Sequence, residues 1–229
     1  MSIFVIADLH LSLRVPKPMD IFGDNWSGHE EKIKKDWLEK VKENDLVILP
    51  GDFSWETYLE NTKLDFGYLN SLPGKKLMLK GNHDYWFSTK TKVEQFLAAE
   101  GLTSIYILFN NAYRYEEYTI CGTRGWFNEP GSTADSKVLL REAGRLKLSL
   151  EAGKKLGGKP LAFLHYPPVS FASSSEELVT LLQEYGVKRC YYGHLHGQSC
   201  ENAVNGIREG IEYRLISGDY IQFDPEFVA

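Results

Sequence analysis

Short apolar runs alternate with helix-like segments along this 229-residue chain, and this alternation limits the possible folds more than any other feature. The clearest runs are continuous and apolar, as strands buried on both faces are: residues 2–7, 46–49, 76–79, 104–108, 161–164 and 189–192. Four segments between them space their apolar residues at helical intervals: 29–42, 91–100, 135–155 and 175–185. Strands that alternate with helices predict a layered α/β fold.

Two stretches depart from this alternation and predict mixed rather than purely parallel sheets. We expect one hairpin from residues 112–115 and 118–121, and another from residues 211–217 and 220–223. The sequence shows no internal repeat, no low-complexity tract and no linker, so we expect a single domain over residues 1–229. The longest irregular stretches are 11–28 and 122–134, and loops of that length in a compact domain are often functional.

Composition excludes several classes of protein. The net charge of -5 argues against binding to extended nucleic acid, although it leaves room for a local basic cleft. No apolar run approaches the roughly 18 to 20 residues of a membrane span, and the N-terminus lacks the pattern of a secretory signal. The three cysteines are scattered, without a CxxC pair, and read as reduced thiols. We therefore expect a cytoplasmic protein without a membrane partner.

Polar side chains suited to metal binding or catalysis follow five of the predicted strands. Ligands of α/β sheets bind at the carboxyl ends of the strands, so these residues are candidates for one shared site. In chain order the segments are Asp8-Leu9-His10, Gly51-Asp52, Gly81-Asn82-His83-Asp84, His165 and Gly193-His194-Leu195-His196. Each of them offers a carboxylate, an amide or an imidazole.

Spacing indicates which of these side chains can converge. Residues two apart in an extended segment point to the same side, so Asp8 and His10 can meet at one point, and so can the two histidines of the last segment. Asn82 and His83 are neighbours and should diverge. We expect Asn82 to face a metal, His83 to face a substrate, and Asp84 to orient His83 by accepting a ring N–H.

The combined donor set exceeds what one metal ion needs. Three residues with oxygen donors and four imidazoles make up the set: Asp8, His10, Asp52, Asn82, His165, His194 and His196. Two ions that share a bridging carboxylate would use all of them. Mixed nitrogen and oxygen donors without thiolate suit Mn, Fe, Zn, Co or Ni, and they do not suit Cu(I) or an iron–sulfur cluster.

The motifs DLH, GD, GNHD, HYP and GHLHG, taken together, resemble those of the calcineurin-like metallophosphoesterases. They run from Asp8 to His196 in the family's order; each is weak alone, and the ordered set is specific. The resemblance implies a four-layer α/β/β/α sandwich with two mixed sheets and a site for two metal ions.

The resemblance also implies a role for each residue of the site. The first metal would have three ligands of its own, namely Asp8, His10 and His196. The second would have three others, namely Asn82, His165 and His194. Asp52 would bridge both ions, His83 would lie near the leaving group without binding metal, and Asp84 would lie behind His83.

These roles predict a metal-dependent phosphoesterase that hydrolyses a phosphomonoester or a phosphodiester. Two cations about 3.5 to 4 Å apart neutralise the phosphate oxygens and lower the pKa of a bound water, so that a metal-bridging hydroxide can attack phosphorus. His83 would assist the leaving group, and such general acid catalysis typically contributes roughly 100- to 10,000-fold. The expected substrate is a small phosphorylated compound or a nucleotide.

Two alternatives remain open at this stage. One is a nuclease or cyclic-nucleotide phosphodiesterase of the same superfamily, and the other is a non-catalytic metal-binding scaffold for interactions. The sequence after Asp52 continues FSWE, where the protein Ser/Thr phosphatase branch has an arginine, so that branch is disfavoured.

Two further residues lie outside the set of predicted metal ligands. Arg124 in the 122–134 loop could clamp a phosphate with its planar guanidinium, and the alternative is an ordinary ion pair. His29 matches no motif, and we expect it to be a solvated or capping residue near a helix start.

Overall fold

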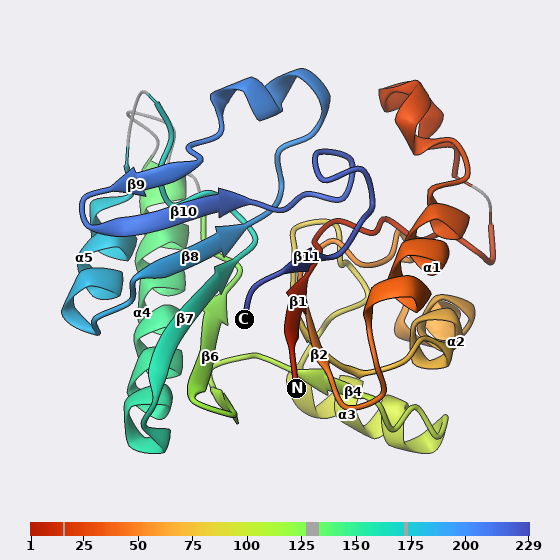
Figure 1. Ribbon diagram of the computed structural model, residues 1–229, viewed down its shortest axis with the longest axis horizontal. Helices are drawn as coiled ribbons and strands as arrows, with labels where there is room; N and C mark the ends of the chain where they lie inside the picture. The colour runs from red at the N-terminus through yellow and green to blue at the C-terminus, as the bar shows by residue number, and fades with distance from the viewer. Residues whose placement is uncertain (16, 127–132, 172–173) are drawn as a thin grey trace. The chain divides into compact units, whose positions relative to one another are not determined.

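The computed structural model describes residues 1–15, 17–126, 133–171 and 174–229. Its contacts divide the chain into two compact units, Met1–Ile107 with Ile216–Ala229, and Leu108–Leu215. Each unit holds one β-sheet and its own helices (Figure 1), which confirms the α/β class with two mixed sheets. The single domain stays a prediction. The predicted loop 122–134 lies partly outside the described residues.

The first unit is built on a five-stranded sheet with the order β11-β1-β2-β3-β4. Its strands are β1 (Ile3–Val5), β2 (Leu46–Pro50), β3 (Lys75–Leu79), β4 (Ile105–Ile107) and β11 (Glu226–Phe227). The first four are parallel to one another, and β11 runs antiparallel to β1. All residues of β1 and β2 are buried, as the continuous apolar runs predicted.

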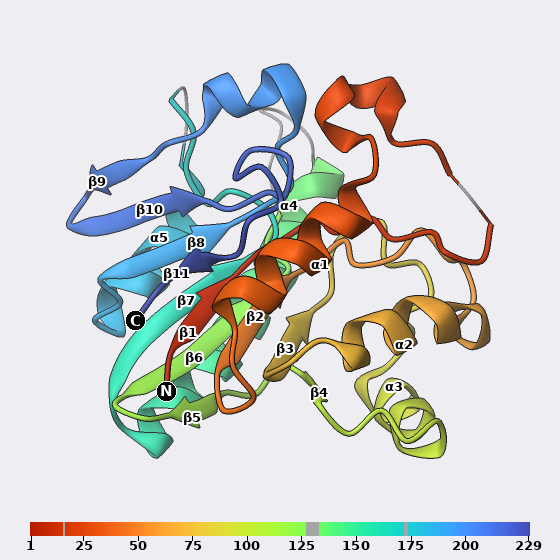
Figure 2. The same cartoon turned by 45° about the vertical axis from the view of Figure 1, so that its right-hand side comes forward.

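Three α-helices connect successive parallel strands of this sheet: α1 (His29–Lys40), α2 (Lys63–Ser71) and α3 (Lys90–Ala99). The order of the strands in the sheet follows the order of the chain, and right-handed connections then place all three helices on one face, as Figure 2 shows. Three short 3₁₀ helices, η1 (Asp20–Phe22), η2 (Asp24–Trp26) and η3 (Leu59–Thr62), lie in the loops. Helix α2 was not predicted, because it is short and carries Gly67 in its interior.

The second unit is built on a six-stranded sheet with the order β5-β6-β7-β8-β10-β9. Its strands are β5 (Tyr113–Tyr115), β6 (Tyr118–Thr123), β7 (Lys159–Leu164), β8 (Arg189–Tyr192), β9 (Gly206–Arg208) and β10 (Ile211–Leu215). Strands β6, β7, β8 and β10 are parallel, and β5 and β9 are antiparallel edge strands. Helices α4 (Thr133–Leu156) and α5 (Glu176–Glu184) and the 3₁₀ helix η4 (Gly197–Asn202) complete the unit.

One predicted hairpin is present and the other is wrong. Strands β5 and β6 pair antiparallel around a turn in which Glu116 is left-handed, as expected. Strand β10, in contrast, pairs antiparallel with β9 across Glu209 and Gly210, both with positive φ, and residues 220–223 form turns. Two successive left-handed residues match the twist of a tight hairpin, which decides the pairing in favour of β9.

In the described part of the chain, no helix combines the length and the apolar character that a membrane crossing requires.

Lys76, the second residue of β3, carries a buried amine. Its side chain is fully buried, and Nζ donates hydrogen bonds to the carbonyl oxygen of Leu72 and, at 3.2 Å, to Oγ of Ser104. Burial lowers the pKa of Lys76 to about 8. The ammonium form is therefore less favourable in the folded chain than in water.

We expect the stability cost of Lys76 to disappear at alkaline pH. The unfolded chain binds more protons than the folded chain between the lowered pKa of about 8 and the ordinary 10.5, so folding gains stability as pH rises through this window. Chemical denaturation from pH 7 to 10.5 should show the wild type gaining stability relative to Lys76→Met. The exposed neighbour Lys75 gives the control, Lys75→Met, and equal pH slopes for the two variants would contradict the prediction.

Candidate functional site

The turn after β1 brings the first predicted ligands together, although not by the extended geometry that their spacing suggested. Asp8 and His10 both have left-handed backbones, with φ of 60° and 45°. Their N–H groups donate to the carbonyl oxygens of Gly51 and Asp52, each at 3.0 Å. Both side chains are buried, with ligand atoms within 4.8 Å of each other. Left-handed non-glycine residues are uncommon and cluster at functional sites.

Asp52 joins this group from the loop after β2. It is buried and left-handed, with φ of 50°. Its Oδ2 lies 3.8 Å from Nε2 of His10, and one of its oxygens lies within 4.8 Å of an Asp8 oxygen. Two buried carboxylates this close repel each other unless a cation or a proton intervenes. The donor set of this unit therefore fits a metal ion.

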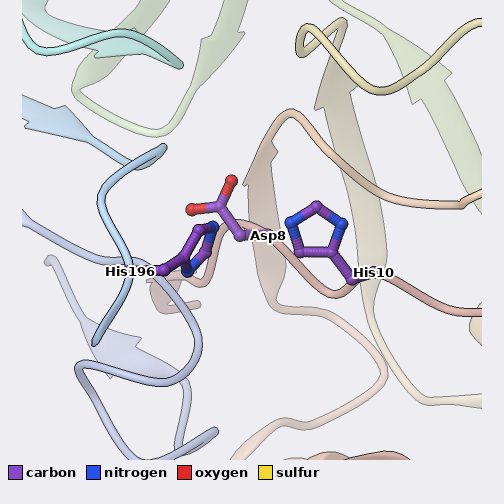
Figure 3. A group of neighbouring side chains, drawn as sticks. All are labelled: Asp8, His10 and His196. Carbon is purple, nitrogen blue, oxygen red and sulfur yellow. The ribbon is translucent and has the colours of Figure 1, made fainter. Parts of the chain in front are cut away.

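Figure 3 draws Asp8 and His10 on the turn that follows β1, where Leu9 separates them. The figure also draws His196, which belongs to the second unit and is described with that unit below.

The GNHD segment after β3 is tied to the loop after β2 by close backbone contacts. The N–H of His83 donates to Oδ1 of Asp52 at 2.8 Å. A Cβ on Gly81 would lie 2.1 Å from the same Oδ1 and 2.3 Å from the Asp52 nitrogen, so only glycine fits at this position. The two loops thus lie too close together at this point for any side chain at position 81.

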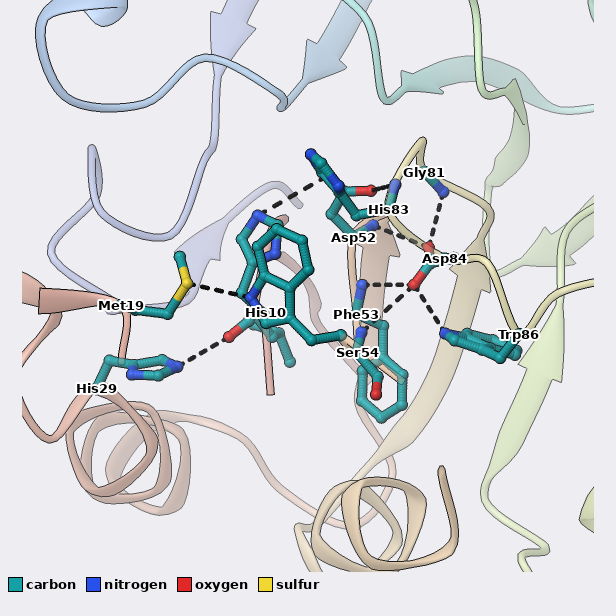
Figure 4. A network of polar contacts seen from close by, with 12 residues as sticks. His10, Met19, His29, Asp52, Phe53, Ser54, Gly81, His83, Asp84 and Trp86 are labelled. Carbon is teal, nitrogen blue, oxygen red and sulfur yellow. Dashed lines mark hydrogen bonds and ion pairs between the residues drawn. The ribbon is translucent and has the colours of Figure 1, made fainter. Parts of the chain in front are cut away.

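Asp84 binds the backbone of these loops and not the ring of His83, which corrects the expected contact. Its fully buried carboxylate accepts hydrogen bonds from one indole and four backbone N–H groups (Figure 4). The donors are Trp86 Nε1 at 3.1 Å and the amides of Asp52, Phe53, Ser54 and Gly81 at 2.8 to 3.3 Å. Burial and the charge of Asp52 raise the pKa of Asp84, while the backbone donors lower it. Asp84 therefore fixes how the loops after β2 and β3 lie against each other.

The ring of His83 lies among aromatic side chains. Its centroid is 4.5 Å from that of Trp55, 5.7 Å from that of His10 and 6.0 Å from that of Tyr85. Trp55 also stacks on His10 at 4.7 Å, with an interplanar angle of 23°. Spacing rules gave no reason to select Trp55, and the one signal was its place in FSWE directly after Asp52. Trp55 thus limits the orientations open to both histidines.

The second unit brings two of its predicted ligands side by side. His165 follows β7 and is fully buried; its N–H donates to the carbonyl oxygen of Arg124 at 3.1 Å, and its own carbonyl accepts from Gly193 at 3.1 Å. His194 follows β8 with a left-handed φ of 75°. The two imidazole centroids are 5.1 Å apart, and the His194 ring packs against Tyr166 at 4.1 Å. Pairing of β7 with β8 produces this arrangement.

His196 caps the 3₁₀ helix η4 and is half-buried. Its N–H donates to Oγ of Ser199 at 2.8 Å, and its side chain accepts from the Ser199 backbone N–H. This reciprocal capping fixes the start of the helix and with it the position of the imidazole within the second unit.

Arg124 takes part in the ion pair that the sequence left open as an alternative. Its Nη2 lies 3.4 Å from Oε1 of the buried Glu142, and its guanidinium lies 5.0 Å from the ring centroid of Trp126. The Arg124 carbonyl also accepts from the backbone N–H groups of His165 and Tyr166. Binding of substrate by Arg124 stays a prediction.

His29 is buried and not solvated, so the expectation for this residue was wrong. It is 3% exposed at the start of α1, and its ring packs against Trp26 and Phe223. Single-sequence reasoning failed because the acidic neighbours Glu30 and Glu31 suggested an exposed helix start.

Comparison with known proteins identifies the family to which this architecture corresponds. A model of the calcineurin-like phosphoesterase family matches residues 1–198. A protein of unknown function from Aquifex aeolicus is similar over 99% of this chain and 95% of its own, with 18% identity and a TM-score of 0.51. The phosphopantetheinyl hydrolase from Mycobacterium tuberculosis is similar over the same shares, with 13% identity and a TM-score of 0.54. Such identities show the fold alone, and no curated protein gives a significant match.

Gly81→Ala should destabilise the first unit, because the added Cβ overlaps Asp52. We expect the free energy of unfolding to fall by about 2 kcal/mol, in the range typical of an overpacked core. Gly67→Ala in α2 is the matched control, since nothing lies within 4 Å of its added Cβ, and it should stabilise by about 0.5 to 1 kcal/mol. Chemical denaturation measures both, and a Gly81→Ala protein as stable as the wild type would contradict the close packing.

Proposed function

Because the chain belongs to the calcineurin-like phosphoesterase family, we propose that it hydrolyses a phosphomonoester or a phosphodiester with two bound metal ions. The observation that carries the proposal is the buried group of Asp8, His10 and Asp52, whose two close carboxylates require positive charge between them. An ordinary core has no use for such a pair. A phosphoesterase uses it to bind the cations that its substrate requires.

We assign the ligands as the family pattern implies. One ion would take Asp8, His10 and His196, and the other would take Asn82, His165 and His194. Asp52 would serve both ions. The second unit supports its part of the assignment, since His165 and His194 are adjacent imidazoles at the ends of paired strands.

Bound ions of this kind neutralise the phosphate oxygens and activate water as the nucleophile. The leaving oxygen then needs a proton, and we assign that donation to the imidazole of His83. Its backbone N–H bonds Asp52, and its ring lies against Trp55, so both its position and its orientation are restricted. Asp84 acts as a positioning residue through the backbone of the two neighbouring loops.

The finer features of the function are also proposals. The donor set suits Mn, Fe, Zn, Co or Ni. The net charge of -5 favours a small phosphorylated compound or nucleotide over extended nucleic acid. In the described part of the chain Cys121, Cys190 and Cys200 form no disulfide, which agrees with a cytoplasmic location.

A substrate panel tests the proposed class directly. Apo protein would be reloaded with Mn²⁺, Fe²⁺, Zn²⁺, Co²⁺ or Ni²⁺ and assayed against phosphomonoesters, phosphodiesters and nucleotides. We expect hydrolysis of at least one class that disappears when the metal is chelated. Stable metal binding with no hydrolysis under any condition would favour a scaffold.

His83→Asn should lower turnover by about 100- to 10,000-fold, because the leaving oxygen loses its proton donor. Metal content should stay at the wild-type level, since His83 is not assigned as a ligand. The exposed neighbour gives the control Tyr85→Phe, which should keep both turnover and metal. Loss of metal from His83→Asn would mean that the division of roles between Asn82 and His83 is wrong.

Asp52→Ala should impair both metal positions together, because one carboxylate is assigned to both ions. Elemental analysis of protein dialysed against a metal buffer measures the stoichiometry. If the Asp52→Ala protein retained one full equivalent of metal, the bridging assignment would be excluded.

A further inference from the structure

The imidazole of His29 contacts the backbone of the metal-binding turn from the side of α1. Its Nε2 lies 3.1 Å from the carbonyl oxygen of Leu9, a contact drawn as the dashed line from His29 in Figure 4, and its Nδ1 lies 3.1 Å from the carbonyl oxygen of Trp26. Leu9 stands between Asp8 and His10, the two predicted ligands. A residue far along the chain thus binds the middle peptide of the turn.

The Leu9 carbonyl depends on this one contact. Leu9 is 1% exposed, and among residues 1–15, 17–126, 133–171 and 174–229 the only hydrogen-bond donor to its carbonyl is Nε2 of His29. A buried carbonyl that loses its donor is unfavourable, so the peptide would rotate to find another. Rotation of the Leu9–His10 peptide changes ψ of Leu9 and φ of His10, and with them the direction of the His10 side chain relative to Asp8.

Two backbone N–H groups of the turn also form hydrogen bonds. The N–H groups of Asp8 and His10 donate to the loop after β2, at Gly51 and Asp52. These bonds fix the two ends of the left-handed turn, whereas His29 fixes its centre. Hydrogen bonds at the ends and at the centre of the turn explain how a left-handed non-glycine residue persists on each side of Leu9 in the sequence.

The surroundings of His29 hold its ring in one orientation. Both ring nitrogens lie against carbonyl oxygens, which only accept, so a ring nitrogen that bonds one of them does so as the donor. Oε2 of Glu30 lies 3.4 Å from Nδ1. Trp26 and Phe223 pack against the ring, with centroids 5.3 and 5.4 Å away, and prevent it from turning.

We propose that His29 is a positioning residue that sets the Asp8-Leu9-His10 turn in its metal-binding conformation. The proposal rests on the proposed function for the identity of the turn as a metal site. The proposal predicts that loss of His29 weakens the binding of one ion selectively. His29 bonds the turn that supplies two ligands of that ion, and it has no hydrogen bond to Asn82, which is assigned to the other ion. Loss of a partner that orients a ligand typically weakens metal binding by roughly 10- to 100-fold.

Titration of Mn²⁺ alone into apo protein, followed by calorimetry, tests the proposal. His29→Leu removes both ring nitrogens, and His29→Gln keeps one donor for the Leu9 carbonyl. Each would be made in two backgrounds that leave a single ion position: Asn82→Ala, which keeps the position of Asp8 and His10, and His10→Ala, which keeps the other. Ile33→Ala, in the same helix and fully buried, controls for general destabilisation.

We expect His29→Leu to weaken Mn²⁺ binding about 10- to 100-fold in the Asn82→Ala background and less than twofold in the His10→Ala background. His29→Gln should recover part of the loss, and Ile33→Ala should lower the melting temperature without this selectivity. Equal weakening in both backgrounds, or none in either, would overturn the proposal. Wild-type protein that binds Mn²⁺ but hydrolyses no phosphoester would refute the proposed function alone, because the role of His29 is read from the titration.

Discussion

Two buried carboxylates, Asp8 and Asp52, lie with ligand atoms within 4.8 Å of each other. Their mutual repulsion is the main constraint on the loops that carry the site in the first unit. At that distance in a medium of low dielectric, like charges cost several kcal/mol unless a cation or a proton lies between them. The surrounding backbone must therefore hold both groups against this force. A metal ion converts the same geometry from a cost into a binding site, which is the physical basis for the proposed phosphoesterase activity.

The backbone meets this demand with hydrogen bonds among three loops. Asp84 accepts from the loops after β2 and β3, and Asp52 accepts from the N–H of His83. The turn after β1 bonds the loop after β2 through its own N–H groups, and His29 bonds its central carbonyl. Each of these contacts acts on the backbone rather than on a reacting atom. The geometry of the site therefore depends on Asp84 and His29, which are assigned no contact with the substrate.

Aromatic rings complete the first unit's share of the site. Trp55 contacts both His10 and His83, and Trp26 packs edge-on to His10 and to His29. Rings of this size exclude water from one side of the imidazoles and restrict their rotation. A proton donor such as His83 benefits from such restriction, because proton transfer to a leaving oxygen requires a defined direction.

The sequence by itself determined the α/β class, the positions of most strands and the identity of the polar residues at their ends. These features follow from local physics: apolar runs of strand length, helical spacing and the rule that ligands gather at the carboxyl ends of parallel strands. The family resemblance added the assignment of roles. Only the tertiary structure decided that Asp84 binds backbone amides, that His29 is buried against Leu9, that Trp55 contacts two histidines and that β10 pairs with β9. Each of these depends on which distant segments meet, or on left-handed backbone at residues such as Asp8 and Glu209, and no spacing rule along a single chain contains that information.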